Sequence, residues 1–245
     1  MNVYSNILQQ QAQGRRQFAV LIDPETRNED SFIRTARAAT EAGVDFLFIG
    51  GSLLSNDNMN VCLDQLRKET RIPLVLFPGS PLQVNPSADA ILLLSLISGR
   101  NPDLLIGSHV IAAPYLKQSG LEIIPTGYML IESGISTTAL YMSHTLPIPG
   151  HKPDIAACTA LAGEMLGLKL IYLDAGSGAL RPVSAEMIQA VRQNTTVPLV
   201  VGGGITHPEM ARKAVLSGAN IVVVGNAIEK DSGLIQEMAH AIHSV

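Results

Sequence analysis

Two aspartates stand where a side chain could do chemistry. Asp23 and Asp174 each come directly after a run of apolar residues, and a carboxylate beside such a run is costly unless it meets a cation or accepts a proton. Asp23 opens an Asp-Pro turn, so it suits a turn residue and a metal ligand equally well. Asp174 opens a glycine-rich loop, and we favour a general base there over a residue that only caps the loop.

Glycine follows two further apolar runs near the end of the chain. Gly203-Gly204 and Gly225-Asn226 come after runs rich in β-branched residues, which are typical of strands buried on both faces. A short helix is expected over 226–229. In a (β/α)₈ barrel, the loops after the last two strands and the start of a short extra helix commonly hold a phosphate. Because glycine lets the backbone approach a ligand closely, we predict a phosphate site here.

Other polar side chains fall near the ends of predicted strands. They are Glu25, Ser52, Thr126, Tyr128, Tyr172 and Ser177. Tyr172 belongs to a strand and could be a core residue, but an outward hydroxyl beside Asp174 would suit substrate contact.

The cysteine and histidine patterns give no sign of a transition-metal site. The sequence has neither a CxxC pair nor an HExxH motif, which are the usual signatures of such sites. Cys62 and Cys158 are expected in helices, as buried or half-buried free thiols in a reducing compartment. Oxygen ligands such as Asp23 would instead suit Mg²⁺.

These residues need a scaffold of alternating strands and helices. Strands are predicted over 18–22, 46–49, 74–77, 91–94, 122–126 and 170–173 and in the runs that begin at 198 and 221. Helices are predicted between most of them. About eight strands with alternating helices indicate a TIM-type (β/α)₈ barrel, in one domain spanning 1–245. In that fold the active site forms at the C-terminal ends of the strands, so Asp23 and Asp174 should lie at one end.

The alternation breaks after the third strand. The stretch 78–89 contains three prolines and a glycine and has no helical repeat, although parallel strands need a crossover. We interpret this as a barrel that lacks one outer helix and is open on that flank; a short distorted helix without consequence is the alternative. The long segment 129–153 is expected to be functional or to form an oligomer contact.

The composition narrows the class of protein. A hydrophobic content of 47% supports a large core, and a net charge of −4 gives no case for a nucleic-acid partner. The longest apolar block, 90–97, is too short to span a bilayer, and the first residues show no signal-peptide run. We expect a cytoplasmic protein.

Seven stretches then resemble one family in the order in which that family has them. They are Phe18-Ala-Val-Leu-Ile-Asp-Pro-Glu25, Phe48-Ile-Gly-Gly-Ser52, Phe77-Pro-Gly79, Ile124-Pro-Thr-Gly-Tyr128, Tyr172-Leu-Asp-Ala-Gly-Ser-Gly178, Val201-Gly-Gly-Gly-Ile205 and Val224-Gly-Asn226. The sequence thereby resembles the second branch of the geranylgeranylglyceryl phosphate synthases. The first branch has a glutamate where this chain has Asp174. The family's barrel also lacks a regular third helix.

The resemblance implies an activity and a set of site residues. A Mg²⁺-dependent prenyltransferase would join geranylgeranyl diphosphate to sn-glycerol 1-phosphate through an ether bond, with Asp174 and Tyr172 as catalytic residues. Mg²⁺ would be held by Asp23 and Ser52. Glycerol phosphate would contact Tyr172, Leu173, Asp174, Ala175, Gly176, Ser177, Gly178, Gly203, Gly204, Gly225 and Asn226. The second branch tends to form larger assemblies, often hexamers, so a homo-oligomer is implied, with Tyr141 as a candidate aromatic anchor.

Other functions stay open from the sequence. The same reaction could use a prenyl chain of another length. A sugar-phosphate isomerase or epimerase would share the phosphate-binding glycines without needing an open apolar flank. A non-catalytic barrel could serve as a binding scaffold through 129–153, although the presence of both Asp23 and Asp174 argues against it.

Overall fold

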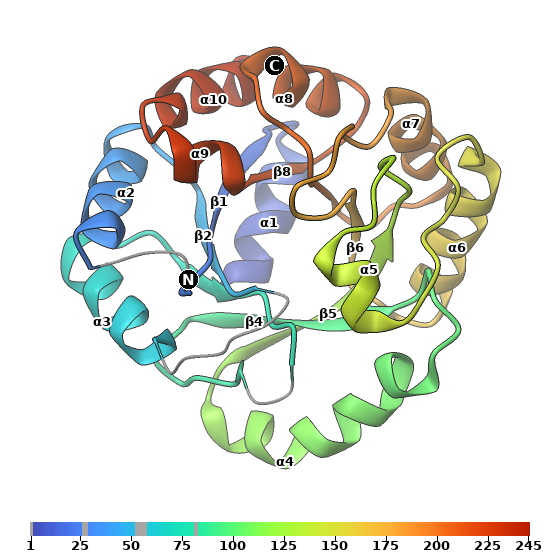
Figure 1. The fold of residues 1–245 in the computed structure, drawn as a ribbon, viewed down its shortest axis with the longest axis horizontal. Coiled ribbons are helices and arrows are strands. Elements are labelled where there is room, and N and C mark those ends of the chain that lie inside the picture. Colours follow the sequence, from blue (N-terminus) through green and yellow to red (C-terminus); the bar gives the residue numbers. More distant parts are fainter. Residues whose placement is uncertain (1, 26–28, 52–57, 81–82) are drawn as a thin grey trace.

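The chain folds into a closed barrel of eight parallel strands. The computed structural model describes residues 2–25, 29–51, 58–80 and 83–245. Each strand pairs with the next in chain order, and β8 pairs with β1 (Figure 1). The strands are β1 (Gln17–Ile22), β2 (Phe46–Ile49), β3 (Leu74–Leu76), β4 (Ala90–Leu96), β5 (Glu122–Leu130), β6 (Leu170–Asp174), β7 (Leu199–Gly202) and β8 (Ile221–Val224). The predicted (β/α)₈ barrel is confirmed.

Helices form a ring outside the strands (Figure 1). They are α2 (Glu29–Glu41), α3 (Met59–Glu69), α4 (Ser108–Ser119), α6 (Pro153–Met165), α7 (Ala185–Asn194), α8 (Pro208–Leu216) and α10 (Leu234–His243). A π-helix, η2 (Asp103–Gly107), leads into α4. Two short helices, α5 (Thr138–Ser143) and α9 (Asn226–Lys230), follow β5 and β8. The predicted short helix after the last strand is thus present.

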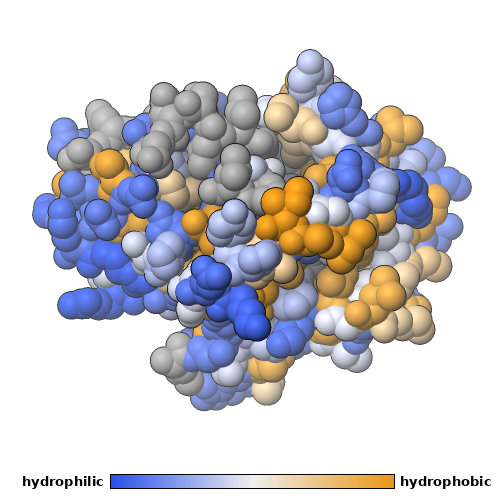
Figure 2. Space-filling model, turned by 90° about the horizontal axis from the view of Figure 1, so that it is seen from below, coloured by the Kyte–Doolittle hydropathy of each residue, from blue (hydrophilic) through white to orange (hydrophobic). Residues whose placement is uncertain are grey.

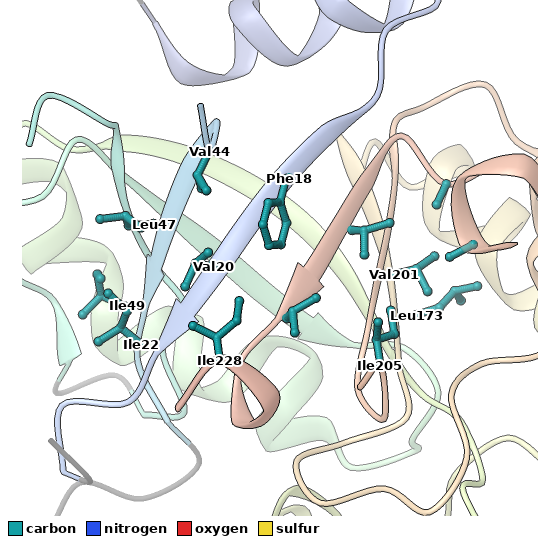
Figure 3. Close-up of a cluster of buried hydrophobic side chains, with 14 of the residues drawn as sticks. Phe18, Val20, Ile22, Val44, Leu47, Ile49, Leu173, Val201, Ile205 and Ile228 are labelled. Atoms are coloured by element: carbon teal, nitrogen blue, oxygen red, sulfur yellow. The ribbon is translucent and has the colours of Figure 1, made fainter. Parts of the chain in front are cut away.

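Successive residues of each strand point alternately into two apolar layers, one between the strands and the helices and one inside the barrel. Phe18, Val20 and Ile22 of β1 point toward the helices (Figure 3), whereas Ala19 points into the barrel with residues of the other strands. Fully burying a large apolar side chain contributes about 1.5–3 kcal/mol. The two layers together therefore fix which side chains of a strand can reach the barrel interior.

The N-terminal end of the barrel is covered by α1 (Val3–Ala12). Val3 and Ile7 of this helix are buried in the interior cluster, and Figure 1 shows α1 behind the strands. The Glu122 carboxylate accepts hydrogen bonds from the backbone N–H groups of Val3 (2.5 Å) and Tyr4 (3.0 Å). These bonds satisfy donors that the first turn of a helix leaves free, so this end is closed and capped.

The crossover from β3 to β4 has no α-helix in the parts that the structure describes, 77–80 and 83–89. The predicted gap in the outer ring is therefore confirmed there. Another expectation needs correction, because β5 does not end at residue 126. Gly127 pairs with Ser95 of β4 and Ile171 of β6, so hydrogen bonds on both sides carry the strand on to Leu130 and place Tyr128 inside it.

The segment 129–153 also has more regular structure than a loop. Its first two residues belong to β5, α5 covers 138–143, and Ile131 forms a bridge with Ile148. Within the described residues, no helix is both long and apolar enough to cross a membrane.

Candidate active site

Asp174 lies at the C-terminal end of β6 and points into the mouth of the barrel. It is 7% exposed. The Tyr128 hydroxyl of neighbouring β5 donates a hydrogen bond to Asp174 Oδ2 at 2.5 Å, and the Gly176 backbone N–H donates to Asp174 Oδ1 at 2.7 Å. Both oxygens of the carboxylate are thereby oriented, one by the next strand and one by the loop that follows.

Burial is the largest influence on the pKa values of Asp174 and Tyr128. Removal from water raises the pKa of Asp174 above its ordinary value, and the hydrogen bonds from Tyr128 and Gly176 lower it by less. Burial and the nearby Asp174 charge raise the pKa of Tyr128 well above its ordinary value, so Tyr128 stays a donor. A carboxylate with a raised pKa is a better proton acceptor than an exposed one, which suits Asp174 to general-base catalysis.

The sequence did not assign a role to Tyr128. In the structure, its hydroxyl orients the predicted base, Asp174. Tyr172, which the sequence did single out, lies one layer below. It is 1% exposed, its ring stacks on Phe77 with centroids 5.2 Å apart, and it meets Tyr128 edge to face. Of the two alternatives that the sequence left for Tyr172, its burial fits that of a core residue. Residues two apart on a strand point the same way, so Tyr172 shares the inward direction of Asp174 but sits deeper in the barrel.

The turn after Asp174 is packed too tightly for side chains. Gly176 has φ +89°, and Gly203 and Gly204 have φ +80° and +68°, values that L-residues with side chains rarely adopt. A Cβ on Gly203 would stand 2.6 Å from Asp174 Oδ1 and 2.5 Å from the Gly176 nitrogen. These glycines were predicted for ligand approach. The structure adds that Gly203 lets the base and its turn pack against β7.

The remaining predicted glycerol phosphate residues lie around this turn. The Ser177 hydroxyl donates a hydrogen bond to Asn226 Oδ1 at 3.1 Å, which joins the loop after β6 to the start of α9. Gly225 precedes α9, and Gly178 has φ +77°. Leu173 and Ala175 have buried side chains, and Leu173 points toward the helices (Figure 3). Only the backbone of these two could therefore meet a ligand.

The predicted metal ligand Asp23 lies across the mouth, at the end of β1. Asp23 follows β1, and its Oδ1 accepts a hydrogen bond from the Glu25 backbone N–H at 3.0 Å. A Cβ on Gly51 would stand 2.8 Å from Asp23 Oδ2, so the carboxylate lies directly against the glycine. Ser52 falls outside the described residues, and within the described ones no three His, Cys, Asp or Glu side chains gather as a metal cluster. A carboxylate at the mouth fits a hard cation that keeps most of its ligands from water or substrate.

An apolar groove begins at Tyr128, whose hydroxyl is bonded to Asp174, and runs along the flank left open after β3. It holds about 220 Å³ and is lined by Tyr128, by Phe77–Ser80, by residues of β4 and by α4 and α5. Ile91 and Leu116 line it toward the far end of β4. Figure 2 shows apolar side chains gathered on the face that carries α4. A long hydrocarbon chain could thus lie in the groove with one end at Asp174.

Comparisons with known proteins agree on one family. The model of the PcrB family matches residues 10–245. A geranylgeranylglyceryl phosphate synthase of Spirosoma linguale is 56% identical over 229 residues, covering 94% of this chain and 92% of that protein. One of Chitinophaga pinensis is 51% identical over 242 residues, covering 99% and 96%. The crystal structure of (S)-3-O-geranylgeranylglyceryl phosphate synthase from Thermoplasma acidophilum, in complex with sn-glycerol-1-phosphate, is 30% identical with a TM-score of 0.94 over the whole of both chains.

Proposed function

This chain belongs to the PcrB family, and we propose that it is a prenyltransferase that joins geranylgeranyl diphosphate to the 3-hydroxyl of sn-glycerol 1-phosphate. The products are geranylgeranylglyceryl phosphate and diphosphate. One observation carries the proposal: a buried, doubly hydrogen-bonded carboxylate, Asp174, lies where a glycine-rich polar mouth meets an apolar groove. An enzyme that joins a phosphorylated polyol to a hydrocarbon chain needs this juxtaposition.

Glycerol 1-phosphate would occupy the mouth. Its phosphate would meet backbone groups of Gly176–Gly178, Gly203-Gly204 and Gly225-Asn226, because glycine lets the backbone approach a ligand closely. Gly176, Gly178, Gly203 and Gly204 also have positive φ. The 3-hydroxyl would then face Asp174. The side chains of Ser177 and Asn226, which are bonded to each other, would fix the two loops on either side of the phosphate.

The reaction forms one carbon–oxygen bond, breaks another and transfers one proton. The 3-hydroxyl oxygen bonds to C1 of the prenyl chain, the bond from C1 to the diphosphate oxygen breaks with its electron pair on diphosphate, and Asp174 accepts the hydroxyl proton. Tyr128 keeps Oδ2 oriented through its 2.5 Å hydrogen bond. Tyr172, the second predicted catalytic residue, lies beneath and contacts the Tyr128 ring edge to face.

Asp23, with Ser52, would hold Mg²⁺. When bound, the ion would neutralise charge that develops on the leaving diphosphate. Asp23→Asn should remove most of the dependence on Mg²⁺ while leaving the affinity for glycerol phosphate largely intact. Titrations of activity with Mg²⁺ and calorimetry with glycerol phosphate measure both. Full activity with an ordinary Mg²⁺ titration would show that Asp23 is only a turn residue.

The prenyl chain would lie in the groove along β4. A sugar-phosphate isomerase would have no use for this space, which is why we place that alternative second. Incubating the protein with radiolabelled geranylgeranyl diphosphate, glycerol 1-phosphate and Mg²⁺ should give a labelled ether lipid. Prenyl diphosphates of other lengths, compared by mass spectrometry of the products, identify the preferred chain. No product with any prenyl diphosphate would refute the proposal.

We also propose a cytoplasmic homo-oligomer, with a hexamer as the expected assembly. Both cysteines are free; Cys62 is buried as expected, whereas Cys158 is exposed. Free thiols fit a reducing compartment. Tyr141 is 74% exposed and Leu146 85%, and large apolar side chains so exposed favour a protein contact. Light scattering after gel filtration should show a multiple of the chain mass, and Tyr141→Glu should reduce it. A monomer at all concentrations would refute the assembly.

A further inference from the structure

Thr137 lies between the proposed base and the apolar groove. It is 4% exposed, and within the described residues its hydroxyl has no hydrogen-bond partner. The residue precedes α5 at the N-cap position with φ −93° and ψ 163°, where a threonine ordinarily gives its hydroxyl to the first turn of the helix. Here the side chain makes no such bond. Something other than capping therefore sets the direction of this side chain.

That direction is toward Gly176. A Cβ on Gly176 would stand 2.7 Å from both Oγ1 and Cγ2 of Thr137, so both branches of the threonine lie against this glycine. Gly176 is the residue whose N–H holds Asp174 Oδ1. From the other side, Gly203 lies against the same turn. Thr137 is thus one of two residues that confine the turn orienting the base.

The helix that Thr137 precedes covers the groove. Ala139, Met142 and Ser143 of α5 line the cavity. The helix has only six residues and ends at Ser143. The next residue, His144, has φ 51°, the one positive value for a non-glycine residue in the described chain. So short a helix has little stability of its own, and its position depends on what it packs against. A chain in the groove would add such contacts.

We propose that Thr137 is a positioning residue that couples prenyl binding in the groove to the orientation of Asp174. This inference rests on the proposed function. A prenyl chain packed under Ala139 and Met142 holds α5 in place, and α5 holds Thr137 against Gly176. The turn then keeps its N–H on Asp174 Oδ1. Because glycerol phosphate is held by that same turn, each substrate favours binding of the other, by the same factor in both directions.

The test measures that factor directly. Calorimetry gives the Kd of glycerol 1-phosphate with Mg²⁺ alone and with Mg²⁺ plus geranylgeranyl thiolodiphosphate, an analogue that reacts very slowly. In the wild-type protein the analogue should tighten binding, within the range of about 5–150-fold that is typical of coupled sites. In Thr137→Ala, which removes both branches, the tightening should vanish while each ligand alone still binds. The value of kcat should fall more than KM changes.

Two further variants separate coupling from mere stability. Thr137→Val keeps the branched shape, so it should restore the coupling even though the hydroxyl is gone. Ser136→Ala, at an exposed neighbour on the same loop, is the matched control and should couple as the wild type does. If Thr137→Ala does not fold, Thr137→Ser, which lacks only the methyl group, should still show weakened coupling.

The outcomes are distinguishable. If both ligands bind the wild-type protein without affecting each other, or if folded Thr137→Ala couples like the wild type, the inference is overturned and the proposed function stands. If neither ligand binds the wild-type protein, the proposed function fails and the inference fails with it.

Discussion

The two ends of the barrel differ in how their polar groups and backbone are stabilised. At the N-terminal end, α1 inserts Val3 and Ile7 into the interior, and Glu122 accepts two backbone N–H groups of its first turn. At the C-terminal end, Gly176, Gly203 and Gly204 adopt positive φ. There Asp174 is held with a raised pKa.

Buried polar atoms without a hydrogen-bond partner also differ between the two ends of the barrel. Within the described residues, four buried side-chain atoms have no hydrogen-bond partner. Ser133 and Thr137 belong to the loop after β5, His109 lines the groove, and only Arg16 precedes β1. Leaving a buried polar group without a partner costs about 1–3 kcal/mol. Three of these four unpartnered atoms thus lie near the mouth or the groove, and one lies near the N-terminal end of the barrel. The active-site end therefore carries more of this cost in stability.

The largest effect should come from the base itself. Asp174→Asn keeps the size of the side chain but cannot accept the hydroxyl proton, and general-base contributions are typically ~10²–10⁴-fold in rate. Turnover should fall by about that order, while glycerol phosphate binding changes much less because backbone groups hold the phosphate. Initial rates beside calorimetry measure the two. Lost binding with unchanged turnover at saturation would make Asp174 a substrate-positioning residue.

Asp174→Asn should not lower the Tm, whereas losing a hydrogen-bond acceptor at the N-terminal end of the barrel should. The native pKa of Asp174 is raised, so its stabilising contribution is present below the ordinary pKa and is lost as the pH rises through the raised one. The ionised form therefore costs stability at neutral pH. Asn should keep or raise the Tm there, and the gain over wild type should shrink in acid.

Gly203→Ala should produce the next largest effect. A left-handed backbone with a Cβ costs about 1–2 kcal/mol, and this Cβ would also meet Asp174 Oδ1 and the backbone of the turn. We expect a lowered Tm from the backbone strain, and a loss of turnover because the added Cβ would displace Asp174. Gly14→Ala is the matched control, because Gly14 also has positive φ but meets nothing within 4 Å. Equal losses of activity in both variants would contradict a special role for the mouth.

At the closed end, a change should affect stability alone. Glu122→Ala removes the acceptor of two N–H groups at the start of α1, and losing such a cap costs about 0.5–2 kcal/mol. Urea unfolding should show this loss, while kcat and both KM values stay at wild-type levels. A large drop in kcat without a stability change would mean that the two ends are not separable as described.

The sequence predicted the fold well because the fold depends on repeated local patterns. The apolar runs 46–49 and 221–224 are bounded by turn residues on both sides, and they became β2 and β8 with those bounds. The three prolines of 78–89 likewise predicted the absence of an α-helix from 77–80 and 83–89, the parts of that crossover that the structure describes. The end of β5 was missed because Gly127 reads as a turn, whereas it is held in the strand by pairing with β4 and β6.

The site was harder to predict because its contacts join distant residues. Asp174 and the glycines were found from their place after strands. The partner of Asp174 was not, since Tyr128 and Asp174 are 46 residues apart and only the β5–β6 register brings them together. Both a core position and an outward hydroxyl stayed open for Tyr172, because the sequence does not tell which face of a strand points into the barrel. Thr137 gave no local signal, because its contact with Gly176 depends on how α5 sits.

The smallest effect should be a shift in pH dependence. The Tyr128 hydrogen bond lowers the pKa of Asp174, so Tyr128→Phe should raise that pKa further above its ordinary value. Because the base must be ionised to act, the acidic limb of the kcat/KM profile should move to higher pH, with little change in rate on the alkaline plateau. Tyr4→Phe removes a hydroxyl at the closed end, where it donates to the Lys169 carbonyl, and should leave the profile in place. If the limb moves to lower pH in Tyr128→Phe, or moves equally in both variants, the Tyr128 hydrogen bond does not tune the base.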